Sequence, residues 1–273
     1  MSAQEQFVLV THPRPHVVLV TLNRPERMNS MAFDVMVPLK AALDDISHDN
    51  EVRVVVLTGA GRGFSSGADH KSAGSVPHVD GLTRPTFGLR SMEVLDDVIL
   101  GLRKLHQPVI AAVNGAAIGG GLCLALAADI RVAATDAYFR AAGINNGLTA
   151  SELGLSYLLP RAIGSSRAFE IMLTGRDVSA EEAERIGLVS RQVPAAELLE
   201  ACYAIAERIA AFSRPGTELT KRTLWSGLDA GSLEAHMQAE GLGQLYIRLL
   251  TSNFEEAVAA RKENRAPAFT DDK

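Results

Sequence analysis

The chain has few cysteines, no excess of positive charge and no long apolar run. Its 273 residues include two cysteines, which are too few for a disulfide framework or a cysteine-based metal motif. The formal net charge of −5 argues against non-specific binding to nucleic acid. No apolar run reaches about 18 residues, and the amino-terminal sequence lacks the features of a secretory signal. We therefore expect a cytoplasmic protein that neither inserts into a membrane nor binds nucleic acid.

Three consecutive glycines are the most informative feature that is present. Residues 108–113 form an apolar run typical of a buried strand, the segment 114–121 ends in Gly119, Gly120 and Gly121, and a helical pattern follows over 122–128. Glycines at a helix start direct free backbone N–H groups and the positive end of the helix to one point. Such a point can bind a phosphate or the negative oxygen that develops on a reacting carbonyl. The other interpretation is close packing of a helix against a strand, where only glycine fits.

A second glycine-rich segment favours the oxyanion interpretation. Residues 52–58 form another strand-like apolar run, which leads into the glycine-rich segment 59–69. Two strands that both end in glycine-rich turns can supply one backbone donor each to a shared oxyanion hole.

The pattern along the chain indicates an α/β body followed by a helical carboxyl-terminal region. Strands are predicted over 7–11, 17–22, 52–58, 109–113 and 130–133, with a short extended stretch at 188–193. Residues 69–88 are expected to form a surface segment without regular structure. Helices are predicted over 31–48, 89–105, 152–159, 166–173, 180–186, 195–212 and 215–260.

Several segments, in their order along the chain, resemble the enoyl-CoA hydratase/isomerase (crotonase) superfamily. They are LNRPERMNSM at 22–31, GRGFSSGADHK at 61–71, PVIAAVNGAAIGGGLCLALAADIRVA at 108–133, LTGRDVSAEEAERIGLVSRQV at 173–193 and EEAVAARKENRAPAF at 255–269. The resemblance implies an α/β fold: a crotonase-type spiral of ββα units over 1–195 and a helical trimerisation region over 196–273. It also implies a homotrimer or homohexamer that takes a coenzyme A thioester as substrate, with no metal and no tightly bound cofactor.

The resemblance also assigns roles to individual positions. It places the backbone N–H groups of Ala68 and Gly120 on the thioester oxygen. Contacts to the coenzyme are implied for Arg27, Met28, Ser66, Ala68 and Phe269. Three basic side chains have two possible interpretations: they lie near the phosphates of the coenzyme, or they are solvated surface charges. These are Arg24, Arg27 and Lys71. Arg265, like Phe269, is a candidate for a site shared between subunits.

The chain departs from the hydratases of this family at both of their glutamates. Those positions hold Cys123, interpreted as a small buried residue, and Gly143. Glu152 is the remaining acid near the expected site and is the candidate general acid and base. Its alternative role is a capping box with Thr149 at the start of a helix. His70 and His78, in the loop after the first glycine segment, are interpreted as possible bases or as solvated side chains.

Four functions remain open from the sequence. Hydration of 2-enoyl-CoA is the activity implied by the family, and a single carboxylate favours double-bond isomerisation through Glu152. Loss of both glutamates would also suit a non-catalytic acyl-CoA binding protein. The G-x-S-x-G pattern at 63–67 raises a serine hydrolase with Ser65 as nucleophile, although no helix pattern follows the serine.

Overall fold

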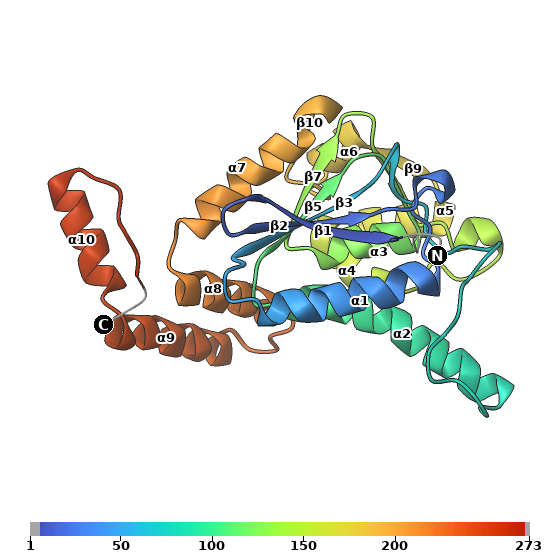
Figure 1. Ribbon diagram of the computed structural model, residues 1–273, viewed down its shortest axis with the longest axis horizontal. Helices are drawn as coiled ribbons and strands as arrows, with labels where there is room; N and C mark the ends of the chain where they lie inside the picture. The colour runs from blue at the N-terminus through green and yellow to red at the C-terminus, as the bar shows by residue number, and fades with distance from the viewer. Residues whose placement is uncertain (1–5, 271–273) are drawn as a thin grey trace, which may run out of the picture.

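The computed structural model describes residues 6–270, which form two β-sheets covered by helices (Figure 1). The larger sheet has six strands in the order β1 (Val8–Arg14), β2 (Val17–Leu22), β3 (Val54–Gly59), β5 (Val109–Val113), β7 (Ile130–Ala134) and β10 (Arg191–Val193). Strands β1 and β2 form an antiparallel hairpin, and the sheet is parallel from β2 onward. The smaller sheet has four strands in the order β4 (Gly63–Ser65), β6 (Ala116–Ile118), β8 (Tyr138–Arg140) and β9 (Asp177–Ser179).

Consecutive pairs of strands divide between the two sheets, and each pair leads into a helix. Strands β3 and β4 precede α2 (Arg84–Lys104), β5 and β6 precede α3 (Gly120–Ala127), and β7 and β8 precede η2 (Ile144–Asn146) and α4 (Leu155–Ile163). The first strand of each pair joins the larger sheet and the second joins the smaller one. This arrangement confirms the predicted α/β spiral of ββα units.

The core lies between the sheets and the helices that cover them. Every residue of β3 and β5 is buried, as expected for continuous apolar runs in a parallel sheet covered on both faces. Helix α7 (Leu198–Ala210) packs against β3, β5 and β7, whereas α1 (Phe33–His48) packs against β1 and α2. Helix α3 packs against β6, α2 and α4, and all of its residues are buried. These contacts fix the amino terminus of α3 inside the molecule.

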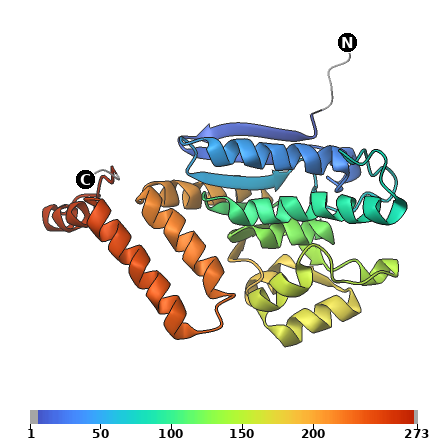
Figure 2. The same ribbon diagram turned by 90° about the horizontal axis from the view of Figure 1, so that it is seen from below.

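The remaining helices follow the second half of the chain. They are α5 (Ser165–Thr174), α6 (Ala180–Arg185), α8 (Arg214–Gly227), α9 (Leu233–Leu250) and α10 (Asn253–Glu263), with the short turns η1 (Pro25–Arg27) and η3 (Ala195–Glu197). Helices α9 and α10 extend away from the body of the molecule in both views (Figures 1 and 2). Among the described residues, no helix is both long and apolar enough to cross a bilayer.

Several predicted boundaries were wrong, and the errors have local causes. The strands of the smaller sheet were missed because each has only three residues, and β4 and β6 lie inside glycine-rich segments. Helix α2 begins at Arg84, within the segment 69–88 that was expected to lack regular structure. The predicted helix over 215–260 is three helices, because residues 228–232 and 251–252 interrupt it.

Candidate active site

The two glycine-rich segments meet at one point of the structure. Gly67 lies just beyond β4, which pairs with β6, and Gly120 is the first residue of α3, just beyond β6. A Cβ on Gly67 would lie 2.6 Å from the carbonyl oxygen of Ile118 and 3.2 Å from the backbone nitrogen of Gly120. Gly67 also has a φ of +79°, which disfavours any side chain. The two segments therefore approach as closely as glycine allows, and we call this contact the glycine junction.

Two backbone N–H groups at the glycine junction remain available. The carbonyl of Gly67 accepts from the Met31 N–H over 2.7 Å, and the Asp69 N–H donates to the Met31 carbonyl over 3.4 Å. Within the described residues, the N–H groups of Ala68 and Gly120 donate to no acceptor. The N–H of Gly120 also lies at the positive end of α3. The geometry suits a ligand atom that carries negative charge.

An ion-pair cluster around Asp69 joins residues 24–30 to the segment after β4. The Asp69 carboxylate accepts from Arg24 over 3.0 Å, from Arg27 over 2.6 Å and from Ser30 over 3.0 Å, and its side chain is 2% exposed. Burial alone would raise the pKa of Asp69. The hydrogen bonds from Arg27, from two backbone N–H groups and from Ser30 outweigh that effect and hold the pKa well below its usual range. Arg24 and Arg27 are therefore bound to Asp69 and are not free surface charges.

Backbone hydrogen bonds place Met28 and Ser66 next to each other. The Ser66 N–H donates to the Met28 carbonyl over 2.9 Å, and the Ser66 hydroxyl lies 3.4 Å from the Arg27 carbonyl. Met28 ends η1 in the left-handed region, with a φ of +52°. The structure thus brings together the two segments to which the resemblance assigns coenzyme contacts, while Lys71 is exposed beyond them.

Glu152 lies beside the glycine junction. A Cβ on Gly119 would be 3.1 Å from Oε1 of Glu152, and the Glu152 side chain is half-buried. Burial raises the pKa of Glu152, and His70 acts electrostatically in the opposite direction. Leu153 and Gly154 follow with φ values of +46° and +79°, and a left-handed leucine is uncommon. This strained turn directs the chain into α4, and Glu152 lies immediately before the turn.

The capping-box interpretation of Glu152 is wrong. Helix α4 begins at Leu155, and its N-cap residue is Gly154. Glu152 therefore lies before the helix, where its side chain cannot close a capping box. No hydrogen bond from this side chain to Thr149 or to another residue is found in the described part of the chain, and the carboxylate stays available.

Neither glutamate position of the family hydratases can carry acid chemistry in this chain. Cys123 is fully buried in α3, and burial, with a smaller effect of Glu152, raises the pKa of its thiol well above the usual range. Its Sγ lies 3.5 Å from the Glu152 carbonyl, so Cys123 is the small packing residue that was predicted. A Cβ on Gly143 would overlap the carbonyl oxygen of Thr149. A glutamate at 143 would require a different backbone.

Other predicted residues lie away from the glycine junction or have different partners. Ser65 is fully buried in β4 and donates to the Asn29 carbonyl over 2.8 Å, so the serine hydrolase hypothesis is wrong. Arg265 and Phe269 follow α10, which extends away from the body of the molecule (Figures 1 and 2). Arg265 forms an ion pair with Glu256 over 2.6 Å. A site shared between subunits stays a prediction.

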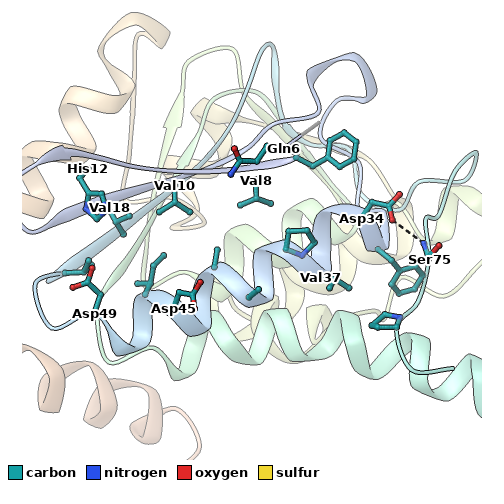
Figure 3. A pocket seen from close by; sticks show the side chains of 18 of the residues that line it. Gln6, Val8, Val10, His12, Val18, Asp34, Val37, Asp45, Asp49 and Ser75 are labelled. Atoms are coloured by element: carbon teal, nitrogen blue, oxygen red, sulfur yellow. Dashed lines mark hydrogen bonds between the residues drawn. The ribbon is translucent and has the colours of Figure 1, made fainter. Parts of the chain in front are cut away.

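A separate cavity of about 1430 Å³ lies between β1 and α1 (Figure 3). Its lining is apolar along Val8, Val10, Val18 and Val37, and it carries carboxylates from three aspartates, namely Asp34, Asp45 and Asp49. None of the residues of the glycine junction lines it. Within residues 6–270, no cluster of histidine, cysteine or acidic residues could hold a metal ion.

A spiral of ββα units whose smaller sheet ends in two apposed glycine turns is the crotonase type of α/β fold. The chain belongs to the enoyl-CoA hydratase/isomerase family, whose model matches residues 14–272. A Mycobacterium tuberculosis protein named probable enoyl-CoA hydratase EchA12 is 85% identical over 97% of this chain and 93% of its own length.

Two solved structures extend the comparison. A probable enoyl-CoA hydratase/isomerase from Mycobacterium abscessus superposes with a TM-score of 0.95, is 74% identical, and covers 98% of this chain and 100% of its own. A monofunctional enoyl-CoA isomerase from M. smegmatis has a TM-score of 0.74 and 70% identity, over 86% of this chain and 99% of its own. Both likenesses extend over most of the chain.

Proposed function

We propose that this enzyme moves the double bond of a 3-enoyl-CoA thioester to the 2-position, with Glu152 as the proton carrier. The observation that carries the proposal is the position of the Glu152 carboxylate beside Gly119, 3.1 Å from the site that a Cβ would occupy. A buried neutral thiol at 123 and the lack of space at 143 leave no second carboxylate at the hydratase positions. Relocating a proton requires one carboxylate, whereas adding water benefits from two.

In the proposed reaction, the ionised carboxylate of Glu152 removes a proton from the carbon next to the thioester carbonyl. The electrons delocalise over the double bond and onto the carbonyl oxygen. The N–H groups of Ala68 and Gly120 stabilise that oxygen, and each such donor is typically worth about 10²–10³ in rate. Protonated Glu152 then returns the proton at the far carbon of the former double bond. Atoms and charge balance, and the carboxylate is restored.

The names of relatives support two activities. The M. smegmatis structure titled a monofunctional enoyl-CoA isomerase, at 70% identity, favours isomerisation. The M. tuberculosis relative named a probable enoyl-CoA hydratase favours hydration of 2-enoyl-CoA as the second candidate. Hydration would require a second group to activate water, in addition to Glu152.

The same proposal places the coenzyme along the segments 24–29 and 64–70, with Arg27, Met28, Ser66 and Ala68 as contacts. It divides the chain into a spiral core over 1–195 and a helical region over 196–273 that forms a homotrimer or homohexamer. The exposed apolar side chains of α9 support this division. Phe269 is proposed to reach the coenzyme of a neighbouring subunit.

Substitution of Glu152 tests the proposed reaction. We expect Glu152→Gln to slow the conversion of 3-enoyl-CoA to 2-enoyl-CoA by about 10²–10⁴-fold, because the amide cannot accept the proton. The control is Glu184→Gln, an exposed acid of α6 away from the site. Products are identified by mass and by the position of the double bond.

Two outcomes would count against isomerisation, and a third would count against the role of Glu152. Addition of one water to 2-enoyl-CoA by the wild type, without double-bond movement, would establish the hydratase. Tight acyl-CoA binding with no product would establish the binding protein. Full isomerase activity in Glu152→Gln would exclude Glu152 as the proton carrier.

A further inference from the structure

A second cavity, of about 430 Å³, lies between α8 and the body of the molecule. Small-molecule sites in proteins typically have volumes of about 300–1,000 Å³, so this cavity is large enough for one small ligand. Its walls are mainly apolar and come from α3, α4 and α8, with Leu126, Leu158 and Leu224 among the lining residues. Within residues 6–270, the lining includes neither Glu152 nor a residue of the glycine junction. The cavity is therefore separate from the candidate active site.

The charged side chains of the lining are three cations and one carboxylate, namely Arg131, Arg161, Lys221 and Asp129. Both oxygens of the carboxylate are engaged. Oδ1 of Asp129 accepts from the indole N–H of Trp225 over 2.6 Å, and Oδ2 lies 2.9 Å from Nζ of Lys221. Lys221 balances this carboxylate, which leaves two guanidinium groups in excess.

Within residues 6–270, neither excess guanidinium forms an ion pair with a carboxylate of the lining. Arg131 donates to two backbone carbonyls, over 2.7 Å and 2.9 Å. Arg161 donates to the Tyr157 carbonyl over 3.1 Å and stacks on the Tyr157 ring, and Asp229, outside the lining, lies 3.9 Å from its Nε. In the described part of the chain, Nη2 of both arginines has no acceptor. Guanidinium donors without acceptors are suited to a carboxylate.

We propose that this cavity binds a small apolar anion of the aliphatic carboxylate class, with its carboxylate at Arg131 and Arg161 and its hydrocarbon chain against the leucines. Burial of the chain in apolar surroundings is favourable, and the carboxylate compensates the excess positive charge. The inference goes beyond the reaction proposed for Glu152 and does not depend on it.

Trp225 provides an optical reporter of this cavity. The chain has one tryptophan, which lines the cavity and is bound to Asp129 through its indole N–H. We expect octanoate to change the emission of Trp225 in a saturable manner, and titration calorimetry to give the same Kd. Octan-1-ol lacks the charge and acetate lacks the chain, so each should bind at least about tenfold more weakly.

Two substitutions test the charge and the space separately. We expect Arg161→Gln to weaken octanoate binding by about tenfold, because one guanidinium is lost. Ala162→Leu adds volume to a lining position of α4 and should block binding while both arginines are retained. The matched control is Arg222→Gln, which removes an exposed cation of α8 outside the lining and should bind octanoate like the wild type. Circular dichroism checks that each variant retains the wild-type fold.

Several results would overturn the proposal. Wild-type affinity in Arg161→Gln or in Ala162→Leu would place octanoate elsewhere on the protein, and equal loss in Arg222→Gln would indicate a general effect of charge. Equal binding of octan-1-ol would show that the cavity does not recognise the carboxylate. A wild type that gives neither a change in emission nor heat would show that it does not bind this class of ligand.

A second copy of the chain is the other possible occupant of the cavity. Octanoate binding by Leu245→Glu/Leu249→Glu, which alters the exposed face of α9, and not by the wild type would show that a second copy covers the cavity, and would also overturn the proposal. None of these measurements requires turnover. Failure of the proposed isomerase reaction would therefore leave the result unchanged, and a protein without octanoate binding could still be an isomerase.

Discussion

Helices α3 and α9 are both rich in apolar residues, and the structure uses them in opposite ways. All residues of α3 are buried, and its amino terminus presents backbone groups to the glycine junction. No residue of α9 is buried, and Leu242, Leu245 and Leu249 are each more than half exposed. At the amino terminus of α3, the backbone carries the proposed chemistry, and the glycines of the junction must lack side chains. In α9 most of the apolar side chains are exposed within residues 6–270, which is typical of a surface that binds another subunit.

Among the predictions that follow from this comparison, the largest effect is expected where the backbone matters most, at Gly67. In Gly67→Ala, the new Cβ would press against the Ile118 carbonyl and the Gly120 nitrogen, at a φ of +79° that alanine disfavours. Displacing one oxyanion donor typically costs about 10²–10³ in rate, so we expect a loss of kcat of that size. Steady-state turnover of 3-enoyl-CoA measures it.

The control for Gly67→Ala is Gly81→Ala, which has a similar φ of +77° but no atom within 4 Å of its Cβ. This variant carries the same backbone strain without the contact, and it should lose a little stability and no activity. Equal activity of the two variants would remove the glycine junction from the proposed mechanism.

The next effect concerns the ion pairs that position the glycine junction. The pKa of Asp69 is lowered in the folded protein, so this group stabilises the fold at any pH above its unfolded value of about 3.9, and the stabilisation is lost as the pH falls below that value. Removing one partner of a buried ion pair typically costs about 3–5 kcal/mol. We expect Asp69→Asn to lower the free energy of unfolding by about 3 kcal/mol at pH 7, and by less at pH 3.

Urea denaturation at both pH values measures the difference, with Asp44→Asn as the control. Asp44 pairs with Lys40 at the surface, where its side chain is 57% exposed, and such pairs contribute about 1 kcal/mol or less. A loss in Asp69→Asn that is the same at pH 3 and pH 7 would show that the carboxylate charge is not the source of the stability.

The sequence predicted the longer elements and the residue types of the site, because both depend on local pattern. The apolar runs that became β3 and β5, and the glycines at the start of α3, are visible without any tertiary contact. The smaller sheet was not predictable in this way, since three-residue strands such as β4 are fixed by pairing with distant partners. The position of Glu152 also depended on tertiary structure: the left-handed turn at Leu153 and Gly154 delays α4 and turns an apparent capping residue into a free carboxylate.

The smallest effect on a single chain, and the sharpest test of the comparison, concerns α9. Leu245 and Leu249 lie one turn apart on its exposed face, and their replacement by glutamate should leave the fold of one chain nearly unchanged, because exposed substitutions typically alter stability by about 0.5 kcal/mol or less. If this face binds another subunit, two buried charges would oppose association strongly. We expect Leu245→Glu/Leu249→Glu to have the mass of one chain in light scattering, with helical content retained in circular dichroism.

Gln244→Glu adds a charge at an exposed polar position of the same helix and should keep the assembled mass. A double variant with the wild-type assembled mass, or a wild type with the mass of one chain, would show that the exposed apolar face of α9 does not hold the assembly together.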